Sequence, residues 1–249
     1  MIRGHKLLNT PELNKGNAFT DQEREDLDLQ GALPDVIESL DEQCIRMYDQ
    51  YCQFETNLEK NVFLNALNDR NTTLFYALLS RHVKEMLPII YTPTIGDAVE
   101  TFSLQERRSR GLYIDYNHKD EIDKMFENRV NEHIDLIIVT DGEGVLGIGD
   151  QGIGAIDISI GKLMVYTVCA GIDPNRVLPI VLDVGTNNQK LLDDPMYLGW
   201  RHKRLKDKEY DDFIDLFVTS VRKNLPGVYL HWEDFGRDNA RKNLNRYRD

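Results

Sequence analysis

The spacing of hydrophobic positions changes near residue 130 and divides the sequence into two parts. Between residues 39 and 87, apolar side chains recur four positions apart, as at Phe63 and Leu67, which predicts amphipathic helices. After residue 130, short apolar runs alternate with such helical stretches. We therefore predict a mainly α-helical region over residues 1–129 and an α/β domain over residues 130–249.

Three β-type runs mark the predicted sheet. They are DLIIVTD (135–141), VLPIVLDVG (177–185) and GVYLHWED (227–234), with helical patterns between them. Strands that alternate with helices indicate a largely parallel sheet. Another helix is predicted after the third run. Because an α/β domain seldom ends after so few elements, we expect this domain to be incomplete in the chain.

Composition and charge narrow the classes of protein and partner. The chain has 249 residues, of which 41% are hydrophobic and 29% charged, as in a soluble globular protein. Its net charge of −12 argues against a nucleic-acid or anionic-membrane partner. Three cysteines without C-x-x-C spacing indicate free thiols in a reducing compartment. Neither a membrane span nor a secretory signal is evident, so we expect a cytoplasmic protein.

A glycine-rich run, GEGVLGIGDQGIG (142–154), follows the first β-type run and precedes a helix. Residues 147–152 satisfy G-x-G-x-x-G, the pattern of a dinucleotide-binding turn. That motif also needs an acidic residue at the tip of the second strand, about twenty residues on. Asp173 has the right separation but lies in GIDPN, which predicts a turn. We therefore predict a loop of the α/β domain, and the cofactor-binding residues stay unknown.

Two side chains stand out as candidate acid–base groups. Tyr91 precedes a tight Thr-Pro turn and could act as a general acid, or could simply be packed with its hydroxyl hydrogen-bonded. Lys162 interrupts an apolar helical run. A desolvated lysine suits a general base, whereas a lysine that reaches water or forms a salt bridge is the structural alternative. The pattern alone leaves both pairs of interpretations open.

Glu233 and Asp234 are adjacent carboxylates at the end of the third β-type run, where α/β proteins place ligands. Such oxygen donors suit Mg²⁺ or Mn²⁺, although a complete site needs a third ligand. His231 shares a face with Glu233 and is predicted to pack against the site or support it. The basic run RHKRLKDK (201–208) is predicted to be a solvated loop.

These segments occur in the order and spacing of the malic enzyme family, which the sequence resembles over nearly its whole length. The motifs are PIIYTPTIG, VTDGEGVLGIGDQGIG, IGKLMVYT, VLDVGTNN and WEDF. Members of that family are roughly twice as long. The resemblance implies that the chain is their N-terminal half, that the NAD-binding domain would follow Asp249, and that the chain alone is inactive.

The resemblance also implies a role for each candidate residue. Tyr91 matches the general acid that protonates the enol of pyruvate, and Lys162 matches the base that takes the hydroxyl proton of L-malate. Glu233 and Asp234 match two of the three protein ligands of Mn²⁺ or Mg²⁺. The third, an aspartate in an FNDD-type motif, would lie beyond Asp249. The implied cofactors are NAD and the divalent metal.

One position departs from the family. Most malic enzymes read DGERILG, and the arginine holds a substrate carboxylate, whereas this chain reads DGEGVLG with Gly144 in the arginine's place. Malolactic enzymes, which convert L-malate to L-lactate and CO₂ with NAD and Mn²⁺, have similar EGILGIGD and LMVYT phrases. Gly144 is therefore a candidate substrate-binding position, and the sequence favours the malolactic branch.

Two alternatives remain. The segments YTPT and LGWRHKR are more like NAD-dependent malic enzymes, which form pyruvate, CO₂ and NADH from L-malate. The chain could instead be a non-catalytic oligomerisation module, because the resemblance implies a homo-oligomer, a dimer or tetramer, built partly from the helical region.

Overall fold

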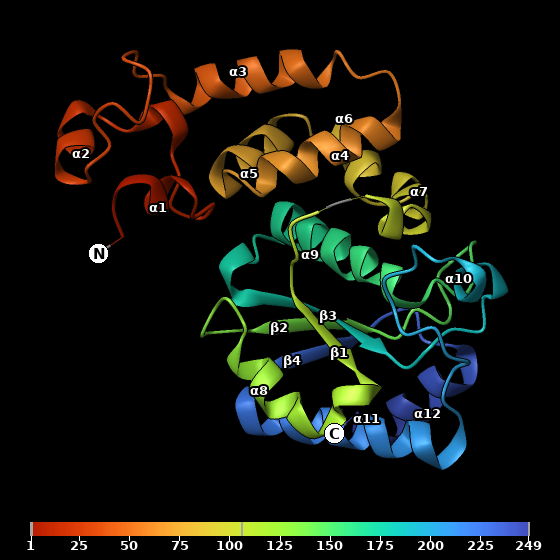
Figure 1. Cartoon of the computed structure of the whole chain (residues 1–249). Coiled ribbons are helices and arrows are strands. Elements are labelled where there is room, and N and C mark those ends of the chain that lie inside the picture. The colour runs from red at the N-terminus through yellow and green to blue at the C-terminus, as the bar shows by residue number, and fades with distance from the viewer. Residues whose placement is uncertain (1, 106, 249) are drawn as a thin grey trace. The chain divides into compact units, whose positions relative to one another are not determined.

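A computed structural model describes residues 2–105 and 107–248 (Figure 1). The chain divides into two compact units, Met1–Thr94 and Ile95–Asp249. This boundary differs from the division at 129/130 drawn from the sequence. The reason is a short strand at Leu112–Asp115, which pairs with the sheet of the second unit.

The first unit is helical, as the four-residue spacing predicts. Its elements are α1 (Gly4–Leu8), η1 (Gly16–Ala18), α2 (Asp21–Asp26), α3 (Leu40–Tyr51), α4 (Asn57–Asn68), α5 (Thr72–Arg81) and α6 (Val83–Ile90). Capping boxes begin three of them, at Thr20, Ser39 and Thr56, where each side chain accepts a bond from the third helical amide. These caps fix where α2, α3 and α4 start.

The second unit contains the sheet. Its strands are β1 (Leu112–Asp115), β2 (Leu136–Thr140), β3 (Val177–Asp183) and β4 (Tyr229–Trp232). Its helices are α7 (Thr94–Glu100, which starts one residue before the unit), α8 (Ile122–Glu127), α9 (Ile156–Ala170), α10 (Gln189–Asp193), α11 (Asp207–Asn224) and α12 (Arg237–Tyr247), with short turns η2 (Phe102–Leu104), η3 (Tyr116–Glu121), η4 (Gly152–Ala155) and η5 (Pro174–Arg176). The three predicted strands and the helices between and after them are confirmed.

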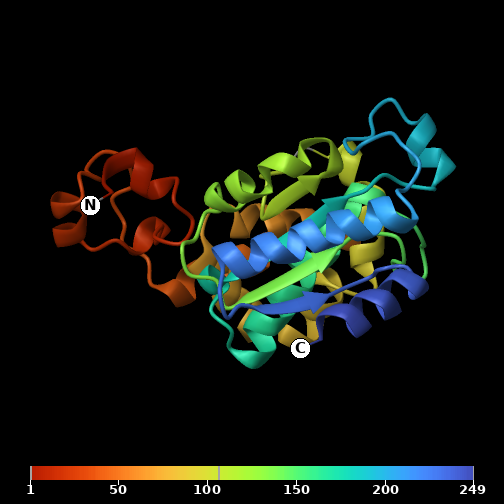
Figure 2. The ribbon, with the colours of Figure 1, turned by 90° about the horizontal axis from the view of Figure 1, so that it is seen from below.

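All four strands are parallel, in the order β1-β3-β2-β4. α9 covers one face of the sheet, and α8 and α11 cover the other; Figure 2 shows α11 lying across the sheet from that second side. β2 is buried on both faces: Ile137 and Val139 pack with α8 and α11, whereas Leu136 and Ile138 pack with Leu163 of α9. The α/β class with a parallel sheet is confirmed, and the strands' carboxyl ends share one edge.

One stretch of the described chain, Gly152–Ala170, is long and apolar enough to cross a membrane by length and composition. More than half of it is buried inside the protein, at 56%. Its helix α9 packs on β2 and β3. The stretch is therefore apolar because α9 is a core helix.

Asp157 makes the stability of the second unit depend on pH. Burial raises the pKa of this carboxyl to about 6, although Arg107, which forms an ion pair with it, and Arg110 pull the pKa down. An unfolded aspartate titrates near pKa 3.9, so the folded chain binds the proton more tightly. The free energy of unfolding therefore loses about 2 kcal/mol as the pH rises from 4 to 7 through this group.

An Asp157→Asn variant does not titrate there. Between pH 4 and pH 7, its free energy of unfolding in urea should gain about 2 kcal/mol relative to the unmodified protein. Asp49→Asn, at an exposed position of α3, is the matched control and should show no such gain. A difference between Asp157→Asn and the unmodified protein that stays constant with pH would contradict the prediction.

Candidate active site

The structure brings the predicted base and a predicted metal ligand into contact. Lys162 extends from α9, and its Nζ forms an ion pair with Oε2 of Glu233, which follows β4. Nε2 of His231 lies 3.0 Å from the same oxygen. The three side chains are only 22%, 12% and 24% exposed, respectively. Of the two interpretations of Lys162, the structure therefore shows a partly buried salt bridge, and it lies within the candidate site.

Glu233 is held as a carboxylate by these neighbours. Burial raises its pKa, but the contacts with His231 and Lys162 outweigh burial and hold the pKa below its usual value. His231 also meets the ring of Tyr166 edge-on, with ring centres 6.1 Å apart. The sequence-based view of His231 as a packing or supporting residue agrees with these contacts.

Asp234 has a different environment from its neighbour. Burial and then the negative charge of Glu233 raise the pKa of Asp234 to about 6. Its backbone is left-handed, with φ of +53°, a conformation that costs a non-glycine residue about 1–2 kcal/mol. Two adjacent carboxylates, one of them disfavoured as an anion by burial and repulsion, fit a divalent cation that would neutralise both.

Within residues 2–105 and 107–248, no group of three or more His, Cys, Asp or Glu residues could hold a metal ion. The described site therefore offers the Glu233–Asp234 pair and no third carboxylate. A third ligand stays a prediction from the family resemblance.

Gly144 packs against the turn that carries Asp234. Its amide donates a hydrogen bond of 2.9 Å to the carbonyl of Asp234. A Cβ atom at Gly144 would lie 2.8 Å from the backbone oxygen of Phe235, closer than real Cβ atoms approach. Close packing therefore explains why position 144 is a glycine. The role of Gly144 in substrate binding stays a prediction.

The loop that contains the G-x-G-x-x-G pattern uses its amides internally. The amides of Gln151, Gly152 and Ile153 donate to Gly142 O (2.9 Å), Asp150 Oδ1 (3.1 Å) and Tyr197 Oη (3.0 Å). These are the donors that a pyrophosphate would need at the start of the helix. The arrangement supports the prediction of a structural loop over that of a dinucleotide site.

Tyr91 ends α6 in the first unit and is half-buried. Lys162, Glu233 and Asp234 all belong to the second unit. The assembly of Tyr91 with these residues in one active site stays a prediction.

Sequence reasoning missed Arg204. The run 201–208 was predicted to be a solvated loop, and that is wrong for this residue, whose side chain is 3% exposed. Its Nε and Nη2 donate to the two carboxylate oxygens of Asp150 at 2.7 and 2.8 Å, and Nη2 also donates to the carbonyl of Asp141 at 2.7 Å. The other cations of the run are exposed. The one available signal was the apolar Leu205 beside it, which is buried too.

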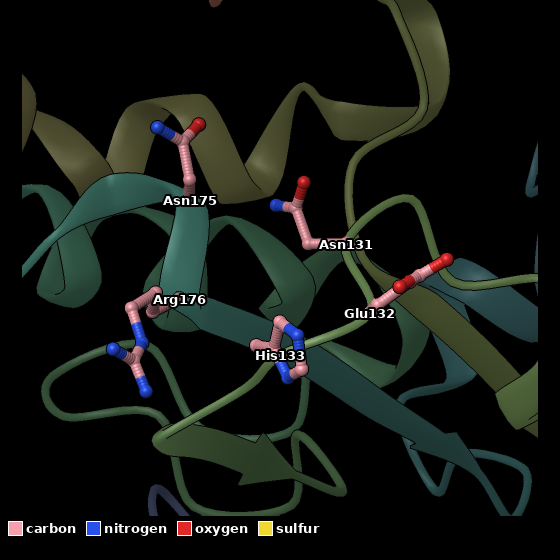
Figure 3. A pocket seen from close by; sticks show the side chains of 5 residues that line it. All are labelled: Asn131, Glu132, His133, Asn175 and Arg176. Carbon is pink, nitrogen blue, oxygen red and sulfur yellow. The ribbon is translucent and has the colours of Figure 1, made fainter.

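A surface hollow of about 490 Å³ lies at the opposite edge of the sheet (Figure 3). It is lined by residues that precede β2 and β3: Asn131, Glu132, His133, Asn175 and Arg176. Arg176 donates to the Asp135 carboxylate at 2.7 Å. Because this hollow is at the amino ends of the strands, it is separate from Lys162 and the carboxylate pair.

Comparison with known proteins identifies the family of the chain. A family model described as the malic enzyme N-terminal domain matches residues 68–248. The chain belongs to the malic enzyme family. A curated NAD-dependent malic enzyme of Idiomarina loihiensis is 54% identical over 246 residues, which are 99% of this chain and 44% of that protein. The NAD-dependent malic enzyme of Sodalis glossinidius is 52% identical over 245 residues, 98% of this chain and 43% of that protein.

The comparisons support some of the sequence-based expectations and leave others untested. Resemblance to the malic enzyme family is confirmed, and the chain spans less than half the length of these curated relatives. Their names support the NAD-dependent malic enzyme alternative better than the malolactic interpretation. The metal ion, the homo-oligomer and the cytoplasmic location stay predictions.

The close approach at Gly144 can be tested by adding one methyl group. Gly144→Ala should lower the free energy of unfolding by about 1–3 kcal/mol, because its Cβ must displace the backbone of Phe235. Gly96→Ala is the control, since Gly96 lies in α7 and its Cβ would meet nothing within 4 Å. That helical replacement should raise the free energy of unfolding by about 0.5–1 kcal/mol. Urea unfolding that finds Gly144→Ala as stable as the unmodified protein would refute the packing role.

Proposed function

We propose that this chain provides the malate- and metal-binding part of an enzyme that converts L-malate and NAD to pyruvate, CO₂ and NADH. The observation that carries the proposal is the contact of Lys162 with Glu233, beside Asp234, at the carboxyl edge of the sheet. Support also comes from relatives named NAD-dependent malic enzyme at 52–54% identity.

Oxidation of the C2 hydroxyl of malate to a ketone requires a base for the hydroxyl proton and an acceptor for the hydride. We assign the base to Lys162, whose amine would accept that proton in its neutral form. Glu233 and Asp234 would hold Mn²⁺ or Mg²⁺, which when bound polarises the C2 oxygen as a Lewis acid. His231 keeps the Glu233 carboxylate in place through its 3.0 Å contact.

Loss of CO₂ leaves the enolate of pyruvate, which becomes pyruvate when it is protonated at C3. We assign this proton to Tyr91, by the family resemblance of its motif. A second acid–base group suits this step, because the proton taken at the C2 oxygen and the proton given at C3 are at different atoms of the substrate.

The products distinguish the two decarboxylation reactions. The polypeptide that carries this chain, expressed at its natural full length, would be incubated with L-malate, NAD and Mn²⁺. Pyruvate with equimolar NADH is expected. Lactate without net NADH would favour malolactic chemistry instead. If neither pyruvate nor lactate formed, malate decarboxylation would be refuted.

Replacement of Lys162 tests the base. Lys162→Met in the same polypeptide should lower kcat by about 10²–10⁴-fold, the usual contribution of a general base. Mn²⁺ binding should persist, because Glu233 and Asp234 are kept. Lys124→Met, at an exposed lysine of α8, is the control and should leave kcat unchanged. A Lys162→Met enzyme with full activity would exclude Lys162 as the base.

A further inference from the structure

Arg204 joins the two ends of the glycine-rich loop that connects β2 to η4. Asp141 begins this loop and Asp150 lies near its end. Arg204 binds both, through the Asp141 carbonyl at 2.7 Å and the Asp150 carboxylate at 2.7 and 2.8 Å. A guanidinium offers several donors in a fixed plane, so it can fix the separation of two groups as a lysine ammonium cannot.

The loop between these two ends is closed by its own backbone. The amide of Val145 donates to the carbonyl of Gly149, and the amide of Gly149 donates back, at 3.1 and 2.8 Å. The amide of Gln151 donates to Gly142 at 2.9 Å. These bonds brace the part of the loop nearest Arg204, between residues 142 and 151, so that the position of its base affects the position of Gly144.

The same loop holds the turn at residues 234–236 at two points. The Gly144 amide binds the carbonyl of Asp234 at 2.9 Å. The Glu143 carboxylate accepts from Asn239 of α12 at 3.0 Å, and it lies so close to Gly236 that a Cβ there would be 2.2 Å away. The Gly144 contact acts directly on Asp234, whose left-handed backbone needs external support, and the Glu143 contacts hold residues that follow Asp234.

We propose that Arg204 is a positioning residue for the Asp234 carboxylate, acting through the loop of residues 141–150. The inference rests on the proposed function, since it treats Asp234 as a ligand of the divalent metal. It does not require Arg204 to touch substrate or metal. Arg204 is the one buried cation of the run 201–208, and this role is additional to its neutralisation of Asp141 and Asp150.

Arg204→Lys tests the proposal, because it keeps the positive charge and removes the planar fork. We expect Mn²⁺ affinity, measured by electron paramagnetic resonance on the full-length polypeptide, to fall about 10–100-fold, as for other residues that orient metal ligands. Hydrogen–deuterium exchange of residues 142–149 and 233–236 should rise in parallel.

Arg24→Lys is the matched control. Arg24 is also buried, in the first unit, and donates to backbone carbonyls such as those of Phe19 and Pro34 at 2.9 and 2.7 Å. It should lower thermal stability as Arg204→Lys does but leave Mn²⁺ affinity unchanged. An equal loss of affinity in both variants would show a general loss of stability and overturn the proposal. So would unchanged Mn²⁺ affinity in Arg204→Lys.

Two further measurements keep the test decisive. If Arg204→Lys does not fold, Gly144→Ala interrupts the same path nearer the metal site, and unchanged Mn²⁺ affinity in that variant overturns the proposal. If the unmodified protein binds no Mn²⁺, the proposed metal site fails on its own. The exchange of residues 233–236 in Arg204→Lys against Arg24→Lys then decides whether Arg204 holds the turn.

Discussion

The second unit depends on a buried charge network in which the guanidinium of Arg204 pairs with the carboxylates of Asp141 and Asp150. Burial raises the pKa of Asp141 to about 6, opposed by Arg204 and by the hydroxyl of Tyr210, which donates to Asp141 at 2.7 Å. At Asp150 burial again raises the pKa, but Arg204 and the donors from residues 186 and 187 prevail and the pKa is lowered. Buried charges persist only when they are paired in this way.

The network matters because of where a parallel sheet ends its strands. Each strand delivers its carboxyl end to the same edge, so Asp115, Asp141, Asp183 and Glu233 follow or end neighbouring strands. Such a concentration of acidic groups repels itself unless cations enter from other elements. Arg204 comes from the segment before α11 and Lys162 from α9. These two cations bind different carboxylates at the same edge, one in the loop and one in the candidate site.

The strands and the types of the candidate site residues were easier to predict from the sequence than the contacts between residues that are far apart in it. Residues 136–140 and 177–183 are apolar enough to mark buried strands, and a lysine in an apolar helix or a carboxylate pair at a strand end is visible by type. The strand at 112–115 was missed because it has four residues of mixed polarity after a basic stretch. Arg204 was missed because its burial depends on Asp141 and Asp150, which are more than fifty positions away.

Gly144 shows how a residue's type can be explained by two causes at once. From the sequence, glycine in place of an arginine indicates a change in how a substrate carboxylate is bound. In the structure, the backbone of Phe235 occupies the space of any Cβ at this position. A glycine required by packing says less about the substrate than a glycine in open space would. The weight of Gly144 as evidence for malolactic chemistry is therefore reduced on physical grounds, and the names of the relatives, which concern the whole enzyme, carry more.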